Sequence, residues 1–122
     1  MAILWCAFFF NSDVDALSSR AVEVGRVVDG DTVVLTSGEI VRLAGINTPE
    51  RETDQKAAEP LADAAHDTLV GMLSKGVIFL EEAPGKTDRY GRTLAYLFLE
   101  DGRSVQEILI REGLASVVAI AP

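Results

Sequence analysis

Short runs of β-branched residues alternate with turn residues in the first half of the sequence, from Val22 onward. The runs VEVGRVV, DTVVL and IVRLA are separated by the turn residues Asp29-Gly30 and Thr36-Ser37-Gly38. Runs of this kind, punctuated in this way, are typical of hairpins, so the pattern predicts a meander of three short strands. Residues 77–80 and 93–99 predict two more strands.

Two segments of the second half have the spacing of amphipathic helices. Pro60 suits the first position of one helix, which Lys75-Gly76 ends, and Ser104 with Glu107 forms a capping box for another, which Gly113 ends. The residues expected to face the core are Leu61, Ala65, Thr68, Leu69 and Met72 in the first helix and Val105, Ile108 and Leu109 in the second. Five strands with a helix between the third and the fourth predict an α+β domain, a five-stranded OB-type β-barrel with two helices.

Composition and charge bound the class of protein. The chain has 122 residues, 48% of them hydrophobic, and one cysteine, Cys6, so it forms a single domain that is stabilised without an internal disulfide. The net charge of −8 opposes binding to a polyanion, which depends on Lys and Arg. From Lys86 to Arg92, however, three basic residues accompany a single acid, Asp88. We expect weak, salt-sensitive binding at this loop.

An apolar run of nine residues, Ala2 to Phe10, lies near the start of the sequence. It is too short to span a bilayer, which takes about 20 residues, and we expect no membrane contact in the mature protein. It fits the core of a signal peptide, with a cleavage site at Ala16-Leu17-Ser18, but the usual preceding basic residue is missing. A mis-assigned start codon or a cropped leader explains it equally well. We expect residues 1–20 to be a leader remnant, residues 21–122 to be the domain, and the protein to be secreted or periplasmic.

Four separated fragments carry candidate chemistry: Asp29-Gly-Asp31, Arg42, Asn47-Thr-Pro-Glu50 and Asp88-Arg-Tyr-Gly-Arg92. Two arginines can grip a phosphate, a carboxylate can activate water, and an acidic turn can hold a hard cation over phosphate oxygens. Each fragment alone is also explained by ordinary turns, solvated loops or surface ion pairs. Their order and spacing together indicate a phosphodiesterase.

In these fragments the chain resembles the staphylococcal-nuclease-like, or thermonuclease, family, whose signature runs Asp-Gly-Asp-Thr, Arg, Asp-Thr-Pro-Glu and Asp-Lys-Tyr-Gly-Arg. The resemblance covers roughly residues 22–118. It implies an OB-type fold and a calcium-dependent endonuclease that cleaves DNA and RNA, preferably single-stranded, with little sequence preference and leaves 3′-phosphate ends. We expect a monomer.

The resemblance also implies residue roles. Arg42 and Arg92 would clamp the phosphate, and Glu50 would be the general base or orient the water. Asp31 would be the carboxylate ligand of a calcium ion, and Asp29 would lie behind it or bind through water. Oxygens of the Asn47-Thr48 segment would complete the calcium site.

Substrate contacts are implied for the basic loop. Arg89 and Tyr90 match the Lys-Tyr pair with which the family contacts a terminal phosphate, and Lys86 adds positive charge to the same loop. The change from Lys to Arg at position 89 keeps the charge.

Three departures from the family pattern bear on function. Asn47 stands where the family has its second metal-binding carboxylate, and Ala119 and Ala121 stand where a well-known member stacks a base on two tyrosines. The sequence also stops before the family's final amphipathic helix, so we expect either a fragment or a minimal domain. The alternative to an enzyme is a non-catalytic nucleic-acid-binding or protein-interaction module of the same fold. Such modules usually lose the residues that match Arg42, Glu50 and Arg92, which this chain keeps.

Overall fold

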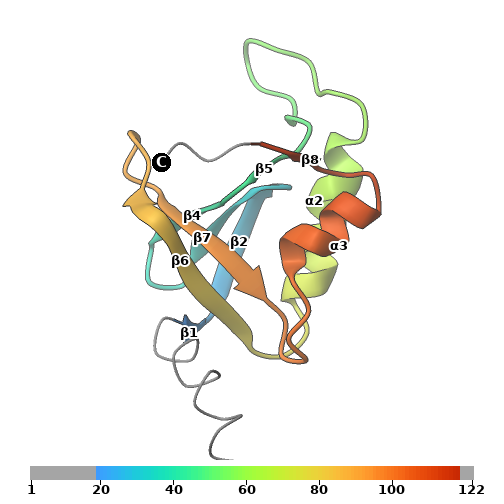
Figure 1. Cartoon of the computed structure of the whole chain (residues 1–122). Coiled ribbons are helices and arrows are strands. Elements are labelled where there is room, and N and C mark those ends of the chain that lie inside the picture. The colour runs from blue at the N-terminus through green and yellow to red at the C-terminus, as the bar shows by residue number, and fades with distance from the viewer. Residues whose placement is uncertain (1–18, 119–122) are drawn as a thin grey trace, which may run out of the picture.

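The computed structural model describes residues 19–118 and shows a mixed α+β domain (Figure 1). The leader expected at residues 1–20 lies almost wholly outside this range, and so do Ala119 and Ala121. The elements in chain order are β1 (Ser19–Val22), β2 (Val24–Asp29), β3 (Thr32–Leu35), β4 (Ile40–Leu43), β5 (Ile46–Asn47), α2 (Ala62–Leu73), β6 (Ile78–Thr87), β7 (Thr93–Phe98), α3 (Val105–Arg111) and β8 (Ser116–Val117).

Six strands form one sheet in the order β1-β6-β7-β4-β3-β2, and β5 and β8 form a separate two-stranded sheet. All neighbours in the large sheet are antiparallel except β4 and β7, which run parallel. The α+β class is confirmed and agrees with an OB-like fold, but the sheet is not a closed barrel. Its two edge strands, β1 and β2, are joined along the chain through Glu23.

Both helices lie on the same side of the sheet (Figure 1), where they cover a core of aliphatic side chains. The largest fully buried side chains come from four strands and both helices: Val33, Val41, Leu43, Leu69, Ile78, Leu80, Leu97, Val105 and Leu109. Partly buried apolar side chains, among them Val22, Val24, Val27 and Met72, pack against this core. None of the helices within residues 19–118 has the length and apolar character to cross a bilayer.

The start of α2 differs from the prediction. The helix begins at Ala62 rather than at Pro60, because Leu61 has a left-handed backbone with φ 69° and interrupts the helical path. Leu61 was expected in the buried stripe but is 58% exposed, whereas Ala65 and Leu69 are buried as predicted. Proline alone therefore did not mark the first helical position here.

The Ser104 half of the capping box of α3 is confirmed, since its side chain accepts a hydrogen bond from the Glu107 N–H. The Glu107 side chain forms an ion pair with Arg111 at 2.8 Å. From this helix the buried Gln106 reaches the parallel pair of strands. Its amide NH₂ donates to the carbonyls of Ala44 and Ala95, and its Oε1 accepts from the Leu97 N–H. Gln106 thus binds β7 to the segment that follows β4, directly behind the strand positions that carry the site.

Candidate active site

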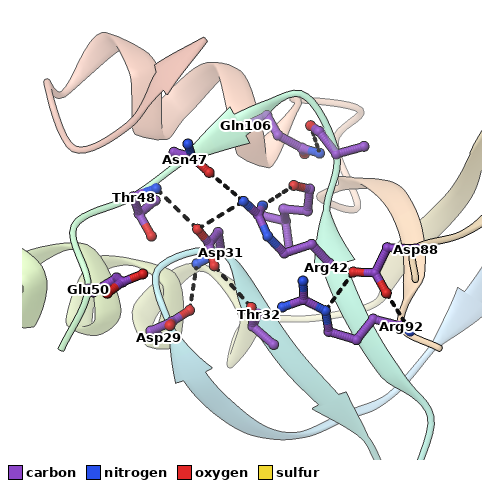
Figure 2. Close-up of polar contacts among 12 residues, drawn as sticks. Asp29, Asp31, Thr32, Arg42, Asn47, Thr48, Glu50, Asp88, Arg92 and Gln106 are labelled. Atoms are coloured by element: carbon purple, nitrogen blue, oxygen red, sulfur yellow. Dashed lines mark hydrogen bonds and ion pairs between the residues drawn. The ribbon is translucent and has the colours of Figure 1, made fainter. Parts of the chain in front are cut away.

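One cleft of about 690 Å³ lies at the junction of the β2–β3 turn, β4, β5 and the loop before α2. Figure 2 shows its polar residues gathered around Asp31, with Glu50 on one side and the two arginines on the other. The predicted catalytic and metal-binding residues that line the cleft are Asp29, Asp31, Arg42, Asn47, Thr48, Glu50 and Arg92. Residues from three of the four sequence fragments meet here, and Arg92 joins them from the fourth.

Asp31 is the central carboxylate and is only 8% exposed. Its Oδ1 accepts from the Thr32 hydroxyl at 2.9 Å, and its Oδ2 accepts from the Thr48 N–H at 3.1 Å. The Arg42 Nη2 lies 3.4 Å from the same Oδ2. These contacts fix the carboxylate and tie the β2–β3 turn to the segment that leads to Glu50.

Asp29 lies two residues before Asp31, and its Oδ1 accepts from the Asp31 N–H at 3.2 Å. Burial, followed by the hydrogen bond and the charge of the neighbouring Asp31 carboxylate, raises the pKa of Asp29 to about 6. The turn therefore holds two carboxyl groups that repel each other when both are ionised. A cation or a proton relieves this repulsion.

Arg42 leaves the sheet on the face opposite Val41 and Leu43, which are both fully buried, as the alternation of the strand predicts. Its Nη1 donates to the Leu43 carbonyl at 2.6 Å, and its Nη2 donates to Asn47 Oδ1 at 2.6 Å. The guanidinium is thus fixed at the edge of the cleft by neutral acceptors on two sides.

Arg92 is held by Asp88, a residue to which the sequence analysis assigned no role. Asp88 Oδ2 accepts from Arg92 Nε at 2.6 Å, while its Oδ1 accepts from the main-chain N–H groups of Tyr90 and Arg92. Burial raises the pKa of Asp88, but the hydrogen bonds donated by Arg92 and Tyr90 outweigh it and hold the pKa below its ordinary value. The signal in the sequence was an aspartate at the start of a tight turn, which commonly accepts from the backbone two residues on.

Of the predicted substrate-binding residues, Arg89 and Tyr90 lie on the loop of Arg92 and Lys86 lies near the end of β6, and none of them lines the cleft. The Tyr90 ring is 68% exposed, and the guanidinium carbons of Arg89 and Arg92 lie 4.9 and 5.3 Å from its centre. Lys86 is exposed and has a left-handed backbone with φ 60° at an irregularity in the β6–β7 pairing. This loop forms a cationic, aromatic rim beside the cleft.

Glu50 lines the cleft from the loop that precedes α2 and is exposed. Its Oε2 lies 3.6 Å from Lys56 Nζ, a contact between two exposed side chains. Its main-chain N–H donates to the side chain of Glu59, which lines the cleft as well and was not recognised in the sequence. Nothing in the spacing of positions 50 and 59 marks this pair, because a loop of irregular shape brings them together.

The donor atoms of the cleft fit a hard cation such as Ca²⁺. Asp29 and Asp31 offer carboxylate oxygens, Asn47 an amide oxygen, and Thr48 a buried hydroxyl that has no hydrogen-bond partner among the described residues. Within residues 19–118, no three His, Cys, Asp or Glu side chains cluster in the way that a fully protein-built metal site requires. These residues therefore fit a cation that also binds water molecules or oxygens of the substrate.

Comparison with known proteins identifies the family of the chain. Residues 40–122 match the family described as staphylococcal nuclease homologue. The chain is 39% identical over 103 residues to the SPbeta prophage-derived endonuclease YokF of Bacillus subtilis, covering 81% of this chain and 34% of that protein. It is 37% identical over 103 residues to the endonuclease YncB of B. subtilis, covering 81% and 48%, and 32% identical over 111 residues to the thermonuclease of Staphylococcus hyicus, covering 88% and 64%.

The chain spans between about a third and two thirds of the length of these relatives. Over that length the fragments that line the cleft fall inside the matched family region from Ile40 onward, and the Asp29–Asp31 turn precedes it. The chain therefore belongs to the staphylococcal nuclease homologue family.

Proposed function

We propose that this domain is an endonuclease that hydrolyses phosphodiester bonds of DNA and RNA with the assistance of calcium. One observation carries the proposal: Arg42, Arg92 and Glu50 line the same cleft as the Asp29–Asp31 turn. A phosphodiester needs cationic donors on its oxygens and a base near the attacking water, and this cleft offers both. The relatives named endonuclease and thermonuclease support the same class of reaction.

Both arginines would bind oxygens of the phosphate. Arg42 is already oriented by Leu43 and Asn47, and Arg92 by Asp88, so their remaining N–H groups meet phosphate oxygens without a large loss of rotamer entropy. Glu50 takes a proton from the attacking water or orients that water. The leaving oxygen takes its proton from the surrounding solvent.

The charge balance of the cleft supports a cation. Four carboxylates, those of Asp29, Asp31, Glu50 and Glu59, line it against two guanidiniums, Arg42 and Arg92. A polyanion does not enter an acid-rich cleft favourably unless that charge is compensated. Asp31, Asp29 and the oxygens of Asn47 and Thr48 would hold the calcium ion, which would neutralise charge on the phosphate oxygens when bound.

The groups in the cleft recognise phosphate rather than base edges, which favours cleavage with little sequence preference. The exposed Tyr90, flanked by two guanidiniums, offers a stacking surface for a base that is not paired in a duplex. We therefore propose single-stranded or frayed nucleic acid as the preferred substrate, with 3′-phosphate ends as the family resemblance implies.

The test is the cleavage of denatured DNA by the purified protein, with calcium and with chelator, alongside Arg92→Lys. The lysine keeps the positive charge but loses the planar fork and the Nε bond to Asp88, so we expect the rate to fall about 100-fold or more while the melting temperature changes little. Arg103→Lys, at an exposed ion pair away from the cleft, is the matched control. Calcium-independent retention of DNA without any cleavage would support a binding module instead.

A further inference from the structure

Glu59 is bound to Glu50 twice. Its Oε1 accepts from the Glu50 N–H at 2.7 Å, and its own N–H donates to the Glu50 carbonyl at 2.8 Å. The two bonds close the loop of residues 51–58 at its base, in the wall of the cleft.

Glu59 is itself fixed to α2. Its carbonyl accepts from the Ala62 N–H at 3.1 Å, where the helix begins, and Pro60 confines Glu59 to an extended backbone. On the other side of Glu50, the Thr48 N–H is bound to Asp31 at 3.1 Å. The backbone at Glu50 is therefore held from the β2–β3 turn and from the helix at the same time.

The Glu50 carboxylate has no comparable hold of its own. Among the described residues its one contact is the 3.6 Å approach of Lys56, between side chains that are 63% and 60% exposed, and such pairs contribute little. The position of the carboxylate thus depends on the backbone that Glu59 fixes.

We propose that Glu59 is a positioning residue for Glu50: its carboxylate oxygen holds the Glu50 main chain so that the Glu50 carboxylate faces the bound phosphate. The inference rests on the proposed function of Glu50 as the base. What Glu59 contributes is an acceptor at the right place and not a negative charge, so an amide oxygen can replace it. This separates the role from that of a metal ligand or a second base, for which the charge matters.

The experiment compares Glu59→Ala, Glu59→Gln and the control Asp54→Ala. Asp54 lies on the loop 51–58 and makes no hydrogen bond or ion pair within residues 19–118. Its replacement by alanine therefore removes the same charge as Glu59→Ala but leaves the two bonds between Glu50 and Glu59 intact. We expect Glu59→Ala to lower kcat about 10- to 100-fold with KM within a factor of three, and Glu59→Gln and Asp54→Ala to stay within a factor of three of the unsubstituted protein in both. A normal kcat for Glu59→Ala, or a Glu59→Gln variant as slow as Glu59→Ala, would overturn the proposal.

A second measurement tests the hydrogen bond between Glu50 and Glu59 independently of the activity. Amide hydrogen exchange of Glu50, followed by NMR, reports its bond to Glu59 whether or not the protein cleaves DNA. We expect exchange at Glu50 to be at least tenfold faster in Glu59→Ala and near normal in Glu59→Gln. If the unsubstituted protein is inactive while this exchange pattern holds, the proposed function is wrong but Glu59 still positions the Glu50 main chain. If exchange is unchanged in Glu59→Ala, Glu59 does not hold the Glu50 main chain and the inference is wrong.

Discussion

Arg42 and Arg92 are oriented by their neighbours before any substrate is present. Each has at least one short bond to a fixed acceptor, Asn47 in one case and Asp88 in the other. Groups that are already oriented toward developing charge lose little on reorganisation during a reaction. Asn47 is the unusual member of this set, because its amide oxygen is shared between a guanidinium and the proposed calcium site.

The substitution Asn47→Asp tests that shared position. If Asn47 is a calcium ligand, a carboxylate in its place should tighten calcium binding about tenfold, because affinity in oxygen sites follows the number of charged ligands. Isothermal titration calorimetry without nucleic acid measures this directly. Gln55→Glu, which adds the same charge on the nearby loop, should change the affinity by less than a factor of two. Unchanged or weaker binding in Asn47→Asp would leave Asn47 as a partner of Arg42 alone.

Asp29 gives a pH dependence to stability. Its pKa is raised from 3.8 to about 6 on folding, so the folded protein holds this proton more tightly than the unfolded chain. The favourable contribution is complete below the unfolded pKa and is lost as the pH rises through about 6. Without calcium, we expect Asp29→Asn to be more stable than the unsubstituted protein at pH 7.5 by about 1 kcal/mol, a value reduced for the partial exposure of the group.

Urea unfolding at pH 4 and at pH 7.5 measures this difference, since other carboxylates titrate alike in both proteins. The gain from Asp29→Asn should be small at pH 4 and largest above pH 6. A variant that is less stable at pH 7.5 would mean that Asp29 is not strained by Asp31 in the folded protein.

At the scale of elements, the site depends on close packing between the β2–β3 turn, the Thr48 segment and α2. Gly30 lies between them, and a Cβ built there would come within 2.8 Å of Ala65 Cβ and of Thr48 Oγ1. The turn can therefore approach the helix only because position 30 has no side chain. The same approach brings Asp31 to the Thr48 N–H.

Two glycine-to-alanine substitutions should act in opposite directions. Gly30→Ala forces backbone and side-chain shifts, and we expect it to lower the free energy of unfolding by about 1–3 kcal/mol. Gly71→Ala lies on the exposed side of α2 with nothing near its Cβ, and we expect a gain of about 1 kcal/mol from helix propensity. Chemical denaturation of both variants checks the pair, and a neutral Gly30→Ala would show that the turn and helix can separate freely.

Elements with a hydrophobic pattern or capping residues of their own could be predicted from the sequence. Elements that form only by pairing with another short strand could not. The runs at β2, β3, β4, β6 and β7 and the capping box of α3 followed from local sequence. β5 and β8 have two residues each and exist through pairing with each other, so no local pattern marks them. The site roles of Arg42 and of the Asp29–Asp31 turn were implied by the family resemblance, whereas the contacts of Asp88 and Glu59 depend on the shape of loops and appeared only in the structure.

At the scale of the whole molecule, an acidic body carries a small cationic rim. The net charge is −8, yet the end of β6 and the loop after it carry Lys86, Arg89 and Arg92 within seven residues. Attraction to nucleic acid is therefore confined to a short stretch of surface. If the domain binds nucleic acid as proposed, the negative charge elsewhere on the molecule should repel the strand and shorten the retention of a product.

This confinement predicts the salt dependence of binding. If Lys86, Arg89, Arg92 and Arg42 contact phosphates, the slope of log affinity against log salt for single-stranded DNA should be about −3, or roughly a 50-fold loss between 50 and 200 mM salt. Fluorescence anisotropy with a Glu50→Gln variant measures it without cleavage. Lys86→Ala should reduce the slope by about 0.7, and Lys75→Ala, away from the cleft, should leave it unchanged. If Lys86→Ala has the same slope as the protein with Lys86, then Lys86 does not contact the nucleic acid.

β4 pairs in parallel with β7, and Arg42 lies opposite Leu94. Because β7 begins directly after Arg92, this pairing brings together two arginines that are far apart in the sequence. A pairing between such distant segments is slow to form, because the intervening chain must be ordered first. β7 must pair with β4 before Arg42 and Arg92 can lie side by side, so a chain without this pairing lacks the phosphate site proposed above. We therefore expect the recovery of cleavage activity after dilution from urea to follow the formation of this one pair of strands.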